Sequence, residues 1–71
     1  MNYLLNALCK KLEGEIEVAK ANVLVYKRNS VGIGEHPQHI EEVDKQIEKI
    51  ANAKEKLEVL EEFEPEKGEV L

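Results

Sequence analysis

Apolar residues in the first part of the chain follow the spacing of one helix face. They lie alternately four and three residues apart, at Leu5, Cys9, Leu12, Ile16, Ala19, Val23 and Tyr26. This alternation is the heptad pattern that keeps one stripe of a helix against a partner helix, whereas a strand alternates every second residue. The pattern therefore predicts one long helix over about residues 2–30.

A second amphipathic stretch predicts another helix over about residues 37–63. Its apolar stripe consists of Ile40, Val43, Ile47, Ile50, Leu57 and Leu60. Ala53 and Lys54 compete for the position that this stripe leaves open. Charged residues fill most of the remaining positions, as they do on the solvated face of a helix.

Residues 31–36 form the break between the two helices. Gly32 suits the left-handed position that ends a helix, and Pro37 suits the first turn of the next one. Because short connections make neighbouring helices antiparallel, we predict an all-α, coiled-coil-like, two-helix hairpin over residues 1–63. Chains this small usually need further packing, so we expect oligomerisation to complete a helical bundle.

The antiparallel arrangement predicts which side chains meet. The facing residues are Leu12, Ile16 and Val23 on the first helix and Ile47, Ile50 and Leu57 on the second. Near the loop, Tyr26 is expected beside Ile40 or Val43. At the other end of the hairpin, Leu5 is expected beside Leu60.

A second set of residues on the first helix predicts a contact with another chain. At about 100° per residue, this set lies roughly 140° from the heptad stripe. Its members are Leu4, Ala7, Gly14, Val18, Ala21 and Val25, and the last five are the predicted contact residues. They are small enough to allow close backbone approach, although small residues are also tolerated on a solvated face.

The last eight residues, 64–71, predict an extended acidic tail, because they contain a proline and show no periodicity. Chain ends become ordered when something holds them. We expect Val70 and Leu71 to dock on a neighbouring chain.

Composition narrows the class of protein. The 71 residues are 42% hydrophobic, 35% charged and only 4% aromatic. This apolar content argues against disorder, and the abundance of Glu and Lys favours helix over sheet. No uncharged stretch approaches the roughly 20 residues of a membrane span, and we expect no cleaved signal. A single cysteine excludes an internal disulfide framework.

Charge is distributed unevenly along the chain, whose formal net charge is −5. Residues 1–31 carry five basic and three acidic groups, whereas residues 32–71 carry five basic and twelve acidic groups. Binding to phosphate backbones depends on Lys and Arg, so nucleic acid is not an expected partner. The acidic second helix could instead imitate nucleic acid, but the simpler interpretation is a solvated coiled-coil exterior.

The residues that could carry chemistry do not form a recognisable catalytic or metal-binding motif. His36 and His39 flank Pro37, and two imidazoles can hold zinc or nickel, but spacing places no third ligand beside them. Cys9 belongs to the heptad stripe, where a cysteine packs as a small apolar residue. A two-helix rod also offers no dry cleft for a general acid. We expect no enzyme activity, no cofactor, no metal and no small-molecule substrate.

Two segments carry a resemblance to a known group of proteins. They are Val31-Gly32-Ile33-Gly34-Glu35-His36-Pro37 and the later Glu55-Lys56-Leu57-Glu58-Val59. Together they resemble small uncharacterised helical-hairpin proteins encoded by tailed bacteriophages, including marine ones. The resemblance covers about half the chain. It implies a phage context and no particular activity.

These observations favour a non-catalytic assembly protein that acts through protein–protein contacts, self-association among them. The resemblance implies a small component of a phage particle, located in the virion or in the cytoplasm of the host cell. The alternative is a soluble acidic regulator that binds and inhibits a host protein.

Overall fold

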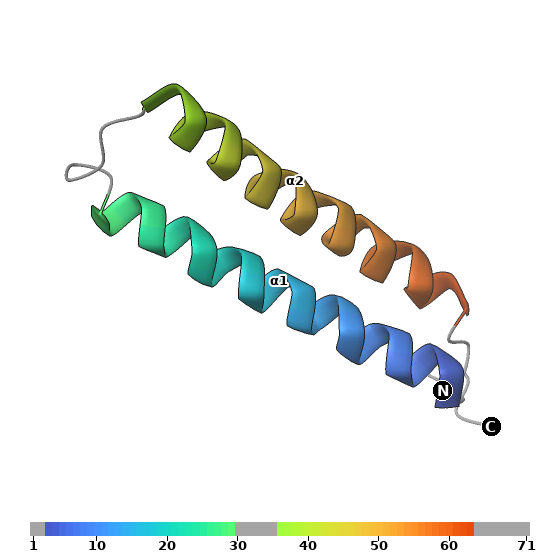
Figure 1. The fold of residues 1–71 in the computed structure, drawn as a ribbon. Helices are drawn as coiled ribbons and strands as arrows, with labels where there is room; N and C mark the ends of the chain where they lie inside the picture. The colour runs from blue at the N-terminus through green and yellow to red at the C-terminus, as the bar shows by residue number, and fades with distance from the viewer. Residues whose placement is uncertain (1–2, 30–35, 64–71) are drawn as a thin grey trace.

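The computed structural model describes residues 3–29 and 36–63, and these form two antiparallel helices. Helix α1 runs over Tyr3–Asn29 and helix α2 over His36–Leu60, followed by the short 3₁₀ helix η2 over Glu61–Phe63. Figure 1 shows the helices side by side along their whole length, with no strand among the described residues. The predicted all-α hairpin is confirmed. The connection and residues 64–71 lie outside the described residues.

The hairpin is a rod because one helix pair makes only one contact layer. The radius of gyration of its Cα atoms is 16.4 Å, whereas a compact domain of this length has a value of about 11 Å. A helix with the 27 residues of α1 is roughly 40 Å long at 1.5 Å per residue. Most side chains therefore have no second layer to cover them.

Local sequence supports α1 before any packing is considered. Ion pairs one turn apart join Lys10 to Glu13 at 3.8 Å and Lys20 to Glu17 at 3.9 Å. Exposed pairs of this kind stabilise a helix by about 0.2–0.5 kcal/mol each. Lys27 and Arg28 lie in the last turn of α1, where positive charge interacts favourably with the helix dipole.

The core lies along the seam between the helices. Its buried apolar residues are Leu12, Ile16 and Ala19 of α1 and Ala53 and Leu60 of α2. Ile50 and Leu57 pack against the centre of this cluster, as the sequence predicts. All seven residues of the predicted α1 stripe are buried or half-buried, so the heptad pattern located this seam correctly.

The predicted stripe of α2 was wrong at two positions. Ile40 is 70% exposed and Ile47 is 48% exposed. The inward positions are instead His39, Val43, Gln46, Ile50, Ala53, Leu57 and Leu60, again four and three residues apart. Only this unbroken spacing keeps one stripe against a straight partner. Ile40 and Ile47 lie about 90° away from it, on one flank of the helix.

The same register settles the contested position along α2, because Ala53 occupies the seam and Lys54 is exposed. Near the loop, Tyr26 was predicted beside Ile40 or Val43. Its ring lies against the ring of His39, with centroids 5.7 Å apart. Ile40 is exposed and Val43 is half-buried on the inward side of α2, so Val43 stays the open alternative.

A polar pair interrupts the apolar seam. The side-chain amide of Asn22 donates a hydrogen bond to Gln46 Oε1 across the helix pair, at 3.1 Å. Gln46 is only 8% exposed, so this hydrogen bond replaces a hydrogen bond to water that the amide loses on folding. Because two amides on facing helices meet in only one register, the pair favours the observed alignment over shifted ones.

Candidate interaction surface

The residues predicted for contact with another chain lie on the solvent side of α1. Val18 and Val25 are exposed, as are Ala7, Gly14 and Ala21. The predicted contact residues Val70 and Leu71 lie outside the described residues. The structure therefore brings five of the seven predicted residues onto one helix, without testing what they bind.

Two larger side chains extend this surface toward the start of α1. Tyr3 is 92% exposed and Leu4 is 80% exposed, and both lie within about 60° of the same helix side. The α1 outer face is therefore defined by Tyr3, Leu4, Ala7, Gly14, Val18, Ala21 and Val25. An added Cβ at Gly14 would meet no atom within 4 Å, so packing within the hairpin does not explain this glycine.

A groove runs along the flank where the α1 outer face approaches α2. This side groove has a volume of about 590 Å³. Its apolar part is made by Gly14, Val18, Ala19 and Ala53, and its polar part by Lys11, Glu15, Gln46, Lys49, Asn52 and Lys56. Small residues from both helices make the hollow possible.

The open end of the hairpin contains a second, more apolar hollow. This end hollow has a volume of about 560 Å³. It is lined by Leu5, Leu8, Glu55, Lys56, Val59, Leu60 and Phe63, so Leu5 and Leu60 lie together as predicted. Lys56 lines both hollows. The side groove and the end hollow are therefore neighbours along one flank.

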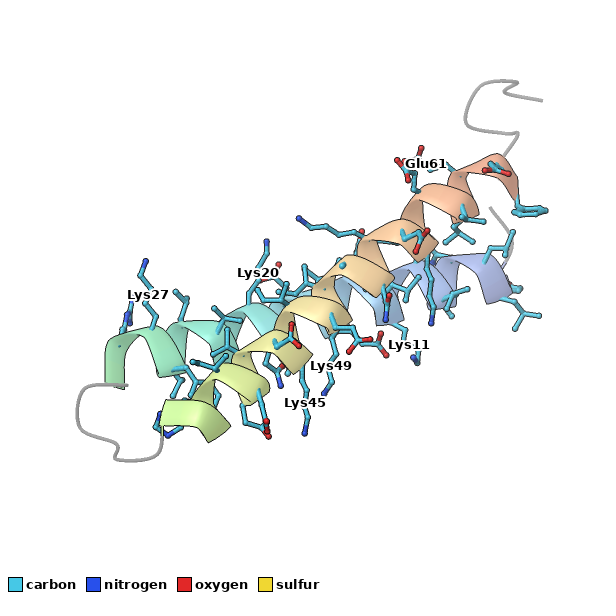
Figure 2. All side chains as sticks on the ribbon, turned by 90° about the horizontal axis from the view of Figure 1, so that it is seen from above. Lys11, Lys20, Lys27, Lys45, Lys49 and Glu61 are labelled. Atoms are coloured by element: carbon cyan, nitrogen blue, oxygen red, sulfur yellow. The ribbon has the colours of Figure 1, made fainter. Side chains whose placement is uncertain are left out.

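The side groove is basic although the chain as a whole is acidic. Figure 2 shows Lys11, Lys45 and Lys49 on one long side of the hairpin, and Lys20, Lys27 and Glu61 on the other. The pKa of the Glu15 carboxyl is lowered because Lys11 donates a hydrogen bond to it, with added attraction from Lys11, Lys56 and Lys49. Three lysines thus surround one carboxylate, leaving a positive surplus.

The outward side of α2 has the opposite character. The exposed carboxylates on this side of α2 and η2, here called the acidic ridge, are Glu41, Asp44, Glu48, Glu55, Glu58 and Glu62. The exposed Ile40 and Ile47 border this ridge, with Lys54 as the basic residue at its edge. The hairpin therefore presents a basic flank and an acidic, partly apolar flank.

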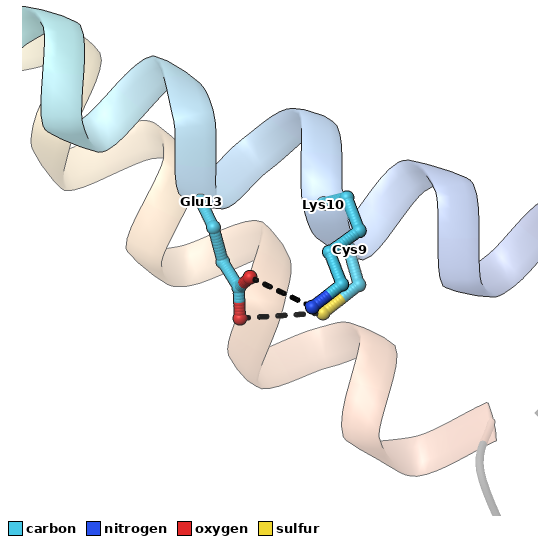
Figure 3. Close-up of polar contacts among 3 residues, drawn as sticks. All are labelled: Cys9, Lys10 and Glu13. Carbon is cyan, nitrogen blue, oxygen red and sulfur yellow. Dashed lines mark hydrogen bonds and ion pairs between the residues drawn. The ribbon is translucent and has the colours of Figure 1, made fainter.

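Cys9 lies in a small polar cluster and not in a fully dry core. Its thiol contacts Glu13 Oε2 at 3.7 Å, while Lys10 Nζ lies 3.8 Å from Glu13 Oε1 (Figure 3). The cysteine is half-buried at the edge of the seam, where the sequence predicts packing.

Among the described residues, no group of three or more His, Cys, Asp or Glu side chains could hold a metal ion. The side chain of His36 lies outside the described part, so the expectation that His36 and His39 bind no metal stays a prediction. Elemental analysis of the purified protein tests it. Neither helix, over its described residues, is long and apolar enough to cross a membrane.

Sequence interpretation missed the side groove and two polar members of the seam, His39 and Gln46. The available signal was the four-and-three spacing through Ala53, which places both residues on the inward face of α2. The groove itself has no linear signal, because its two walls come from residues more than 25 positions apart.

Comparisons with known proteins provide no relative to this hairpin. The chain matches no protein-family model, no curated protein and no solved structure.

Proposed function

We propose that this chain is a non-catalytic assembly protein that acts through protein–protein contacts, including contacts with its own copies. The observation that carries the proposal is the α1 outer face. One side of α1 already packs on α2, and the other side exposes Tyr3, Leu4, Val18 and Val25. Grouped apolar side chains on a small protein mark an interaction surface.

The small core supports the same proposal. The described residues bury five apolar side chains, and two of these are alanines. A two-helix rod leaves most of its apolar area in water, and chains of this size usually gain stability from a further packed element. Association through the α1 outer face would supply that element by placing α1 between two partners.

Self-association is tested by sedimentation equilibrium across a range of concentrations. The expected mass exceeds the 8.1 kDa of one chain. Val18→Arg is expected to lower it toward the monomer, because Val18 lies where the α1 outer face borders the side groove. Asn6→Arg is the control, since it adds the same charge at an exposed position on another side of α1. An unchanged mass for Val18→Arg would place the contact elsewhere. A monomeric wild type at every concentration would remove self-association from the proposal.

We further propose that the protein is a small component of a phage particle. This context comes from the sequence resemblance to phage hairpin proteins. Mass spectrometry of purified particles tests it, with the lysate free of particles as the control. The proposal requires enrichment of the chain in particles, and its recovery only in the lysate would contradict it.

The acidic ridge favours a second candidate function, a soluble regulator that binds and inhibits a host protein. Six exposed carboxylates along one side of α2 and η2 present a surface that attracts a basic partner. Reversing Asp44 and Glu48 to lysine is expected to abolish such binding. The particle experiment separates this role from an assembly role, because a regulator remains outside the particle.

A further inference from the structure

We infer that the side groove accepts helix α2 of a second copy of this chain, with Ile40 and Ile47 seated in the groove and the acidic ridge against its lysines. This inference rests on the proposed self-association and names the two surfaces that meet. Ile40 and Ile47, with the acidic ridge beside them, are here called the docking stripe. The contact is head-to-tail, because the side groove and the docking stripe are different parts of the hairpin.

The groove has the shape and chemistry for an acidic amphipathic helix. Gly14, Val18 and Ala53 leave room for apolar side chains at its base. Neither Lys49 nor Lys56 forms an ion pair with another described residue. Both lysines are therefore available to carboxylates on an incoming helix, whose negative charge would offset the positive surplus around Glu15.

The chain itself presents such a helix. Ile40 and Ile47 are seven residues apart on the same side of α2. Both are exposed, so they can contact a helix outside their own hairpin. Asp44 and Glu48 follow the two isoleucines on the ridge side, one helical turn apart. A copy of α2 thus combines two apolar side chains with carboxylates in the arrangement that the groove complements.

The dimensions of the two surfaces agree. From Gln46 to Phe63, the flank that contains both hollows is roughly 25 Å long along the helix axis, at 1.5 Å per residue. The stretch of α2 from Ile40 to Glu55 rises by roughly 22 Å. The end hollow adds apolar area next to the lysines, so one docked helix covers both hollows.

The two surfaces lie on opposite sides of the same helix. Ile40 and Ile47 are about 180° round α2 from Lys49 and Lys56. One chain can therefore donate its stripe to a neighbour while its own groove accepts another neighbour. Contacts of this kind generate rings or open filaments instead of closed two-fold dimers.

The test uses one variant defective in each surface. Lys49→Glu with Lys56→Glu disables the groove, and Ile40→Gln with Ile47→Gln disables the stripe. Native mass spectrometry is expected to show each variant alone as a monomer at concentrations where the wild type associates, with affinity lowered about tenfold or more. Circular dichroism checks folding, and Lys49→Gln with Lys56→Gln replaces the acidic groove variant if that variant unfolds.

An equimolar mixture of the two variants distinguishes the head-to-tail contact. The groove variant still donates its stripe to the intact groove of the other chain, so a 1:1 dimer forms. The two disabled surfaces do not bind each other, since both are acidic, and growth stops at the dimer. The control is Lys20→Glu with Lys27→Glu on the opposite side (Figure 2), which is expected to associate like the wild type.

Each other outcome contradicts a defined part of the reasoning. If either surface variant associates like the wild type, or if the mixture gives no 1:1 dimer, the groove inference is wrong while self-association stands. A wild type that is monomeric at all concentrations overturns this inference together with proposed self-association. Loss of association in the Lys20 and Lys27 control would show a general charge effect and would also overturn the groove assignment.

Discussion

Replacement of Leu12 by alanine tests the physical account of the hairpin most directly. Leu12 is 1% exposed and, among the described residues, is the largest side chain that is fully buried. It packs in the centre of the seam with Ile16, Ala53, Ile50 and Leu57. The substitution removes three carbon atoms, which corresponds to about 2.4 kcal/mol of transfer free energy at about 0.8 kcal/mol per methylene.

A cavity term adds to this value. Buried Leu→Ala substitutions generally cost about 2.7–5 kcal/mol, and the larger values occur where surrounding structure cannot relax. A two-helix seam has open flanks and can partly close over the missing atoms. We therefore expect Leu12→Ala to lower the free energy of unfolding by about 3 kcal/mol.

Urea unfolding followed by circular dichroism measures the effect. Wild type and variant are compared at equal protein concentration, because self-association also contributes to stability. Leu24→Ala is the matched control, since it makes the same chemical change in the same helix at a side chain that is 44% exposed and that lies outside both the seam and the α1 outer face. It is expected to lower the free energy of unfolding by about 1 kcal/mol at most, because roughly half of the side chain is already in water. A Leu12→Ala effect as small as that of the control would refute the seam assignment.

Three further predictions follow from the described contacts. Gly14→Ala is expected to stabilise the monomer by about 1 kcal/mol, since alanine is the better helix former and an added Cβ meets no neighbour within 4 Å; a lower urea midpoint would contradict this. Asn22→Ala is expected to lower the free energy of unfolding by about 1–3 kcal/mol, because it leaves buried Gln46 without its cross-helix hydrogen bond. The double variant Asn22→Leu with Gln46→Leu is expected to lose less stability in urea unfolding. Equal losses for the two variants would contradict the role of the hydrogen bond. Glu15 stabilises the fold above its ordinary pKa of 4.5, and this contribution is lost as the pH falls through its lowered native pKa. Urea midpoints of wild type and Glu15→Gln are therefore expected to differ slightly at pH 7 and to converge at low pH, and a gap that widened on acidification would reverse the sign of the reasoning.

Periodicity alone was sufficient to locate α1 and its buried side. The stripe from Leu5 to Tyr26 has no missing position, so a single helix orientation buries all of it. The pairing of Leu5 with Leu60 at the open end also followed from the sequence, because two helices of similar length joined by a short connection align end to end. These features depend on local spacing and chain length, which a linear sequence contains.

The inward side of α2 could not be chosen from hydrophobicity. Ile40 and Ile47 are more apolar than His39 and Gln46, and the sequence prediction preferred them. The structure selects the other side of the helix, because only the series through Ala53 remains continuous along the seam. The buried Gln46 amide is satisfied there by its hydrogen bond with Asn22 on the facing helix, and no sequence pattern predicts that partner.

The α1 outer face, apart from Tyr3, could be predicted from the sequence as a second set of small and apolar positions, since these positions belong to one helix. The side groove required the tertiary structure. Its walls join Gly14 and Val18 of α1 to Lys49 and Lys56 of α2, and their alignment depends on the register that the seam selects. Local spacing therefore determined which residues form helices and which side of α1 is buried. Packing between the helices decided which apolar and charged side chains remain together on the surface, because a shift of one residue along α2 would turn its flanks by about 100°.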